Sequence, residues 1–102
     1  MEPPSGSVAF LFTDIEGSTV RWDRDPEAMK TAVRTHDAML RALIAQHHGH
    51  IFKALGDAFC VGFQDVGQAV NAALDTQRTL AKEDFSSVDG LRVRTAIHVG
   101  ES

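Results

Sequence analysis

The sequence has little cysteine, no excess of positive charge and no long apolar run, and each shortage excludes a class of protein. Cys60 is the only cysteine among 102 residues, so an internal disulfide is excluded and a reducing compartment is expected. Ten Lys and Arg stand against 14 Asp and Glu, a net charge of −4 that argues against a nucleic-acid surface. No apolar run approaches the roughly 18 residues of a membrane span, and the first residues lack the order of a signal peptide. We therefore expect a cytoplasmic protein with no nucleic-acid partner and no membrane partner.

The composition that remains is typical of one folded domain. Hydrophobic residues make up 43% of the chain and charged residues 24%. Residues 1–7 hold two of the three prolines and are predicted to be a flexible N-terminal tail, which leaves 8–102 as the folded core. A core of this size supports two layers of secondary structure, so any ligand site should be shallow or shared with another chain.

Hydrophobic periodicity predicts an alternation of strands and helices. The apolar run 8–12 predicts a strand that ends at Thr13 and Asp14, and the pair Asp25 and Pro26 predicts a helix start. That helix should end near Gly49, with the glycine in the left-handed conformation. The full set of predicted elements is strand 8–12, helix 26–47, strand 50–55, strand 58–64, helix 66–83 and strand 91–100.

The order strand, helix, strand, strand, helix, strand is that of the ferredoxin-like split βαβ fold, an α+β architecture. We predict an antiparallel sheet in the order 4-1-3-2, with both helices on one face. In this order the first strand lies antiparallel beside the third, so the end of one meets the start of the other. Asp14, after the first strand, should therefore lie close to Asp57, which shares a two-residue hairpin turn with Gly56.

Two neighbouring carboxylates repel each other unless a cation or a shared proton offsets their charge. Oxygen ligands favour a hard ion such as Mg²⁺, which completes its coordination with water and substrate phosphates. The residues after Asp14 form a small polar turn, and Gly17 allows its amides to face an anion such as a triphosphate. Each residue also has a plain structural interpretation, since an Asp after a strand is commonly a turn residue and a Gly-Asp pair a common hairpin. Lys53 either extends its charge into solvent at a sheet edge or points at a ligand.

Three segments, FTDIEGST, KALGDAFC and LRVRTAIHVG, resemble in order and spacing the catalytic domain of class III adenylate and guanylate cyclases, over Val8 to Ser102. The resemblance implies conversion of ATP or GTP to the cyclic 3′,5′-monophosphate and pyrophosphate. It implies that Asp14 and Asp57 are catalytic and hold two Mg²⁺ or Mn²⁺ ions per complete site, together with the backbone carbonyl of Ile15. The implied phosphate contacts are Glu16, Gly17, Ser18 and Thr19.

The resemblance also bears on substrate and assembly. Lysine at the position of Lys53 goes with adenine in this family, because it can donate to the N1 acceptor of adenine, so ATP is the expected substrate. Family domains continue beyond the point where this sequence ends, into an asparagine and an arginine that stabilise the transition state, and their sites form between two subunits. We therefore expect a homodimer or other self-association, and little or no turnover from these 102 residues alone. The alternatives are a catalytically dead cyclase-like module for dimerisation or regulation, and a polymerase-palm-like fold.

Other polar and aromatic side chains have simpler interpretations. The histidines 47, 48 and 50 suggest zinc, but their positions around a helix end point the rings in different directions. His36 is expected to be a hydrogen-bonded core residue, and Trp22 and Arg21 are expected to close the glycine turn onto the first helix.

Overall fold

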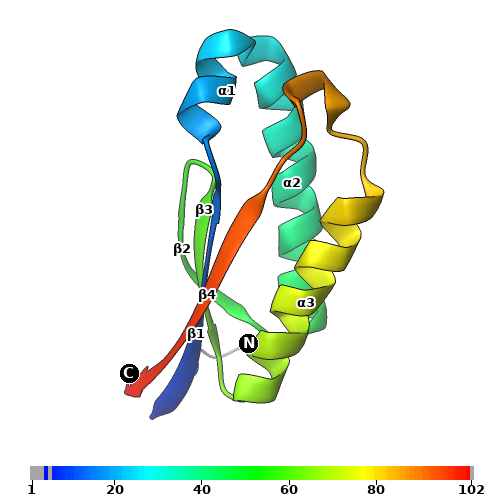
Figure 1. The fold of residues 1–102 in the computed structure, drawn as a ribbon. Helices are drawn as coiled ribbons and strands as arrows, with labels where there is room; N and C mark the ends of the chain where they lie inside the picture. The colour runs from blue at the N-terminus through cyan, green and yellow to red at the C-terminus, as the bar shows by residue number, and fades with distance from the viewer. Residues whose placement is uncertain (1–3, 5, 102) are drawn as a thin grey trace.

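A four-stranded antiparallel sheet is covered on one face by two long helices in the computed structural model, which describes residue 4 and residues 6–101 (Figure 1). The elements are β1 (Ser7–Ile15), α1 (Ser18–Arg24), α2 (Pro26–Gln46), β2 (His50–Leu55), β3 (Ala58–Phe63), α3 (Val66–Lys82), the short 3-10 helix η1 (Ser86–Val88) and β4 (Val93–Glu101). The strand order β2-β3-β1-β4 confirms the predicted ferredoxin-like fold and its 4-1-3-2 sheet. The expected N-terminal tail falls partly on residues 1–3 and 5, which lie outside the described residues. Within the described part of the chain, no helix is both long and apolar enough to cross a membrane.

The first strand is longer than the apolar run predicts. β1 continues through Thr13 and Asp14 to Ile15, so the prediction that it ends at Thr13 and Asp14 was wrong. The reason is backbone pairing: β1 pairs with β4 along its whole length, from Ser7 opposite Glu101 to Ile15 opposite Val93. Ladder hydrogen bonds make no demand on side-chain polarity, and Asp14 therefore lies within the sheet.

Both long helices begin at an aspartate cap, of which Asp25 was predicted. The Asp25 carboxylate accepts a hydrogen bond from the Ala28 amide at 3.2 Å, and the Asp65 carboxylate accepts one from the Gly67 amide at 3.0 Å. The end of α2 differs from the prediction, because His48, and not Gly49, has the positive φ, at 61°. Glycine is needed at position 49 for another reason, since a Cβ there would lie 2.8 Å from the Phe63 ring.

The core lies between the sheet and the two long helices, in two clusters. The first contains Ala9, Leu11, Leu40, Ile44, Phe59, Val61, Phe63, Ala69 and Ala72. The second contains Ile15, Met29, Ala32, Leu80, Phe85, Val88 and Val93. His36 is fully buried beside the Phe59 ring, and its Nδ1 is 2.8 Å from an oxygen of Asp37, as expected of a hydrogen-bonded core histidine.

The opposite face of the sheet has no helix over it (Figure 1). Side chains alternate along a strand, so residues 10, 12 and 14 of β1 share the face that points away from the core. Phe12 is 45% exposed there, and Phe52 and Leu55 of β2 are also exposed. This uncovered surface, called the open face below, carries the candidate site.

Candidate functional site

A pocket of about 490 Å³ lies on the open face and crosses all four strands. It brings together two of the predicted site residues, Asp14 from β1 and Lys53 from β2. Arg94 of β4 and Cys60 of β3 also line it. Asp57, Ile15 and the turn 16–19 are not among the lining residues. The pocket therefore joins a carboxylate and an ammonium group on one shallow surface, as the small core predicts.

Asp14 is held by an ion pair that the sequence reasoning missed. Arg94 lies directly opposite Asp14 in the β1–β4 register. Its Nε donates to one carboxylate oxygen at 2.8 Å, and its terminal nitrogen donates to the other at 2.7 Å. This hydrogen bonding and the charge of Asp14 raise the pKa of the Arg94 guanidinium. In this arrangement both oxygens of Asp14 already accept a hydrogen bond from a cation.

Asp57 lies in the β2–β3 turn, as the hairpin prediction requires. The hairpin closes at Leu55 opposite Ala58, and Gly56 has a φ of 57°. The β1–β3 ladder runs to Thr13 opposite Phe59, so Asp14 and Asp57 follow at the same end of adjacent strands. Among the described residues, no group of three or more His, Cys, Asp or Glu side chains is arranged to hold a metal ion. Convergence of the two carboxylates on one ion stays a prediction.

The donor set nevertheless fits a hard divalent cation. Asp14 and Asp57 offer carboxylate oxygens, and Mg²⁺ commonly binds proteins through one or two carboxylates. Ile15 packs its side chain in the second core cluster and is 3% exposed, so only its backbone carbonyl could act as a ligand. A cation bound here would need water or phosphate oxygens to complete its coordination.

The polar turn after β1 has the unusual backbone predicted for it. Gly17 adopts the left-handed conformation, with φ 65° and ψ 29°, and it precedes α1 directly. Ser18 and Thr19 belong to the first turn of α1, a helix that was not predicted, whereas the sequence analysis placed them in a small polar turn. Amides in a first helical turn have no acceptor within the helix. The Glu16 amide is already used, because it donates to the Arg92 carbonyl at 2.8 Å.

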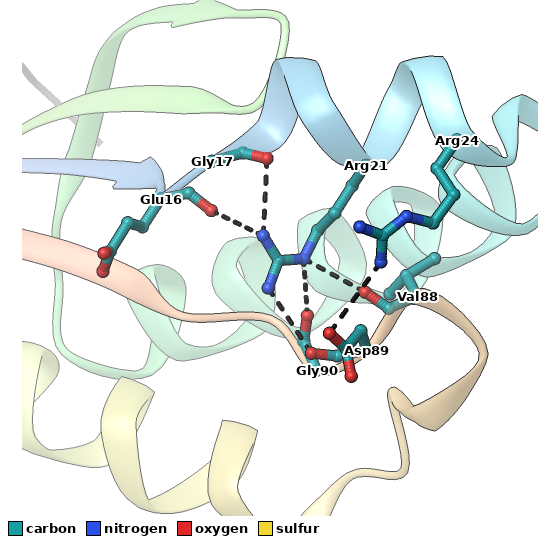
Figure 2. A network of polar contacts seen from close by, with 7 residues as sticks. All are labelled: Glu16, Gly17, Arg21, Arg24, Val88, Asp89 and Gly90. Atoms are coloured by element: carbon teal, nitrogen blue, oxygen red, sulfur yellow. Dashed lines mark hydrogen bonds and ion pairs between the residues drawn. The ribbon is translucent and has the colours of Figure 1, made fainter.

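Arg21 fixes this turn against the segment that precedes β4 (Figure 2). Its Nε donates to the carbonyls of Val88 at 3.1 Å and Gly90 at 2.8 Å. One terminal nitrogen lies 3.2 Å from the Glu16 carbonyl and 3.4 Å from that of Gly17, and the other lies 3.4 Å from the Asp89 carbonyl. Arg21 thus connects the turn to residues 88–90, while Trp22 packs against the second core cluster. A Cβ at Gly17 would lie 3.0 Å from the guanidinium, which is a second reason for glycine there.

Lys53 and Cys60 are cross-strand partners beside Asp14 in the pocket. They pair in the β2–β3 register, next to a bulge between Ile51 and Lys53. Burial raises the pKa of the Cys60 thiol, and the positive charge of Lys53 lowers it by a smaller amount. Cys60 is therefore largely protonated near neutral pH and acts as a small apolar surface in the pocket.

Histidines 47, 48 and 50, near the end of α2, are not part of any metal-binding group of three or more such side chains in the described part of the chain. The Nε2 of His47 lies 2.7 Å from an oxygen of Asp75, which joins α2 to α3. His48 has the positive φ of the helix end, and the His50 ring packs edge-on against Phe52. The rings of His47 and His50 therefore have different partners.

Known proteins resemble this chain in sequence and in fold. A family model described as the adenylate and guanylate cyclase catalytic domain matches residues 1–102. An adenylate cyclase of Schizosaccharomyces pombe is 39% identical over 85 residues, which are 83% of this chain and 5% of that protein. A receptor-type adenylate cyclase of Trypanosoma congolense is 40% identical over 81 residues, which are 79% of this chain and 11% of that protein.

Solved structures share the fold. A structure of adenylate cyclases from Trypanosoma brucei in their monomeric state has a TM-score of 0.91 at 28% identity, over 99% of this chain and 59% of that chain. A guanylate cyclase domain from Catenaria anguillulae in complex with GTP has a TM-score of 0.83 at 20% identity, over 94% of this chain and 57% of that chain, and this likeness concerns the fold alone. The chain thus spans a small part of the curated relatives and just over half of these solved chains. It belongs to the adenylate and guanylate cyclase catalytic domain family.

Proposed function

We propose that this chain forms the metal-binding half of a nucleotide cyclase site that acts on ATP. The observation that supports the proposal is that Asp14 and Lys53 both line the pocket on the open face, while Asp57 follows at the same end of the strand next to that of Asp14. In the reaction, the 3′-hydroxyl oxygen of ATP attacks the α-phosphorus, the bond to pyrophosphate breaks, and the hydroxyl proton passes to solvent. When bound, divalent cations lower the pKa of that hydroxyl and offset charge on the phosphate.

The side chains of this chain have distinct parts in the proposal. Asp14, Asp57 and the Ile15 carbonyl hold Mg²⁺ or Mn²⁺ beside the pocket. The Lys53 ammonium donates a hydrogen bond to N1 of adenine, an acceptor that guanine lacks because its N1 carries a hydrogen. The amides of residues 17–19 face the phosphates, and Arg21 keeps this turn in place. Because the active sites of the family form between two subunits, we propose that a second copy supplies the remaining residues.

Titration of the protein with Mn²⁺ and ATP, followed by calorimetry or NMR, tests the proposal. Asp14→Asn and Asp57→Asn should each weaken Mn²⁺-dependent ATP binding by tenfold or more, since a hard cation depends on its carboxylate ligands. Glu27→Gln is the matched control, because it removes the same charge from an exposed residue outside the pocket. Lys53→Glu should reverse the preference of the site from ATP to GTP. Binding that is unchanged in both Asp variants would refute the proposal.

A catalytically dead module that serves dimerisation is the second candidate. It is favoured by the exposed Phe12, Phe52 and Leu55 on the open face, which a second copy would cover. Under this alternative the chain self-associates, but the Asp14→Asn and Asp57→Asn variants bind ATP and Mn²⁺ no differently from the parent protein. The same titration therefore separates the two functions.

A further inference from the structure

The pair formed by Arg94 and Asp14 differs from the other ion pairs of the described residues. Both oxygens of Asp14 accept from the same guanidinium, at 2.8 and 2.7 Å, in the fork geometry typical of strong arginine–carboxylate pairs. The other arginine pairs with carboxylates in the described part of the chain are single contacts of 3.4 Å or longer. Each oxygen of Asp14 thus already accepts one hydrogen bond from a positive charge, on the face where Asp14 would bind a metal ion.

A guanidinium in this position competes with a divalent cation for two reasons. Its hydrogen bonds occupy both carboxylate oxygens, so a metal ion must share or displace them. Its own positive charge, within hydrogen-bond distance of the carboxylate, also repels a second cation at the same oxygens. Coordination of a metal ion through both oxygens, on the side of Asp14 that the fork occupies, therefore requires the guanidinium to move away.

We propose that Arg94 is a latch that occupies the metal-binding side of Asp14 in the metal-free protein and exchanges with the divalent cation. This inference rests on the proposed function, because it concerns the same carboxylate. Arg94 is a positioning residue here: it acts on the metal ion only through Asp14. The latch makes the affinity for metal depend on how easily the ion pair opens.

The surroundings of Arg94 allow it to open. The side chain is 62% exposed, and β4 lies at the edge of the sheet. Asp14 is the side chain that Arg94 hydrogen-bonds, and the more weakly acting negative charge of Glu16 also attracts the guanidinium. Exposed ion pairs contribute little net stability, so a divalent cation can displace this one at a modest cost in affinity. We expect the latch to weaken cation binding by about two- to fivefold, the range that exposed pairs support.

NMR titrations of the full 102-residue chain test the latch, with Mg²⁺ and with paramagnetic Mn²⁺ as probes. Arg94→Gln should bind Mn²⁺ about two- to fivefold more tightly than the parent protein, as measured from broadening of the amide signals of residues 12–15. Arg92→Gln is the matched control, because it removes the same charge two residues away from a side chain that makes no described contact with Asp14. Arg94→Lys keeps the charge and loses the fork, so its affinity should lie between those of the parent protein and Arg94→Gln.

A second signal reports on the latch directly and is independent of any variant. The Arg94 Nε–H resonance should shift during the Mg²⁺ titration with the same midpoint as the Asp14 amide, because the two hydrogen bonds break as the ion binds. Equal Mn²⁺ affinity in the parent protein and in Arg94→Gln, or an Nε–H signal that does not move while the Asp14 amide does, overturns the latch and leaves the proposed function standing. If neither protein binds Mn²⁺ at millimolar concentration, both the proposed function and the latch fail.

Discussion

Removal of the Arg21 guanidinium should destabilise the fold far more than removal of a neighbouring arginine. Arg21→Met keeps the length and apolar stem of the side chain but leaves the carbonyls of Val88, Gly90 and Glu16 without their donor. The single hydrogen on Nε is shared between the Val88 and Gly90 carbonyls, so these two contacts count as one hydrogen bond. The contacts with the Gly17 and Asp89 carbonyls, at 3.4 Å, are too long to contribute as full hydrogen bonds. Two well-formed interactions remain, each with a net contribution of about 1 kcal/mol, so we expect a loss of about 2 kcal/mol.

Urea denaturation followed by circular dichroism measures this loss as a change in the free energy of unfolding. Arg24→Met is the matched control, since Arg24 lies in the same helix and makes one contact of 3.9 Å with Asp89, between side chains that are 66% and 84% exposed. Such a pair should change stability by less than about 0.5 kcal/mol. Hydrogen exchange should also accelerate at the amides of residues 86–90 in Arg21→Met and not in Arg24→Met. Equal losses in the two variants would contradict the assignment of Arg21 as the residue that joins the turn to residues 88–90.

Three further predictions concern a pocket residue, a core residue and an exposed residue. Cys60 should react with iodoacetamide more slowly than free cysteine at neutral pH, because burial raises the pKa of the thiol. For the same reason, the pH at which the alkylation rate of Cys60 increases should be higher than that of free cysteine. Lys53→Met should move the pH midpoint of the Cys60 alkylation rate still higher, since the positive charge of Lys53 lowers the pKa of the thiol. A shift of this midpoint to lower pH would contradict the prediction. Leu40→Ala should lower the free energy of unfolding by about 2–5 kcal/mol in urea titrations, because Leu40 is 1% exposed, and a loss below about 1 kcal/mol would not fit a packed core. Sedimentation velocity should show concentration-dependent self-association that Phe12→Thr weakens, whereas Val20→Thr on α1 should not; a monomer at every concentration would rule out this use of the open face.

The arrangement of the strands could be predicted from the sequence because it follows from the order of the elements. Right-handed crossovers leave few ways to place four strands around two helices, and the observed β2-β3-β1-β4 sheet is the predicted one. The end of β1 could not be predicted in the same way. Side-chain polarity at Thr13 and Asp14 suggested an end, but partner strands on both sides extend the ladder. Hydrophobic patterns in the sequence therefore predict which segments form strands better than they predict where the backbone pairing of a strand ends.

The sequence identified acidic and basic candidate side chains, whose roles stay predictions, but it did not identify their partners. Asp14 and Lys53 were expected near a ligand, and both line the pocket. The position of Arg94 depends on the β1–β4 register, which no short turn determines, because three α-helices and two other strands separate β1 from β4 in the chain. The only available signal is in residues 91–100, where Arg92, Arg94 and His98 alternate with apolar residues, so that Arg94 is expected on the more polar face of the strand. Arg21 was expected beside the glycine turn, but its contacts with residues 88–90 had no signal in the sequence, because the acceptors are backbone carbonyls, which every residue possesses.

The two arginines differ in what a ligand could do to them. Arg21 donates to carbonyls from two separate segments, and releasing it would leave several backbone acceptors unsatisfied at once. Arg94 donates to a single exposed carboxylate, and a divalent cation would satisfy that carboxylate as well as the guanidinium does. Ligand binding should therefore leave Arg21 in place and move Arg94. Arg21 would then keep the polar turn joined to residues 88–90 while Asp14 exchanges the Arg94 guanidinium for a metal ion.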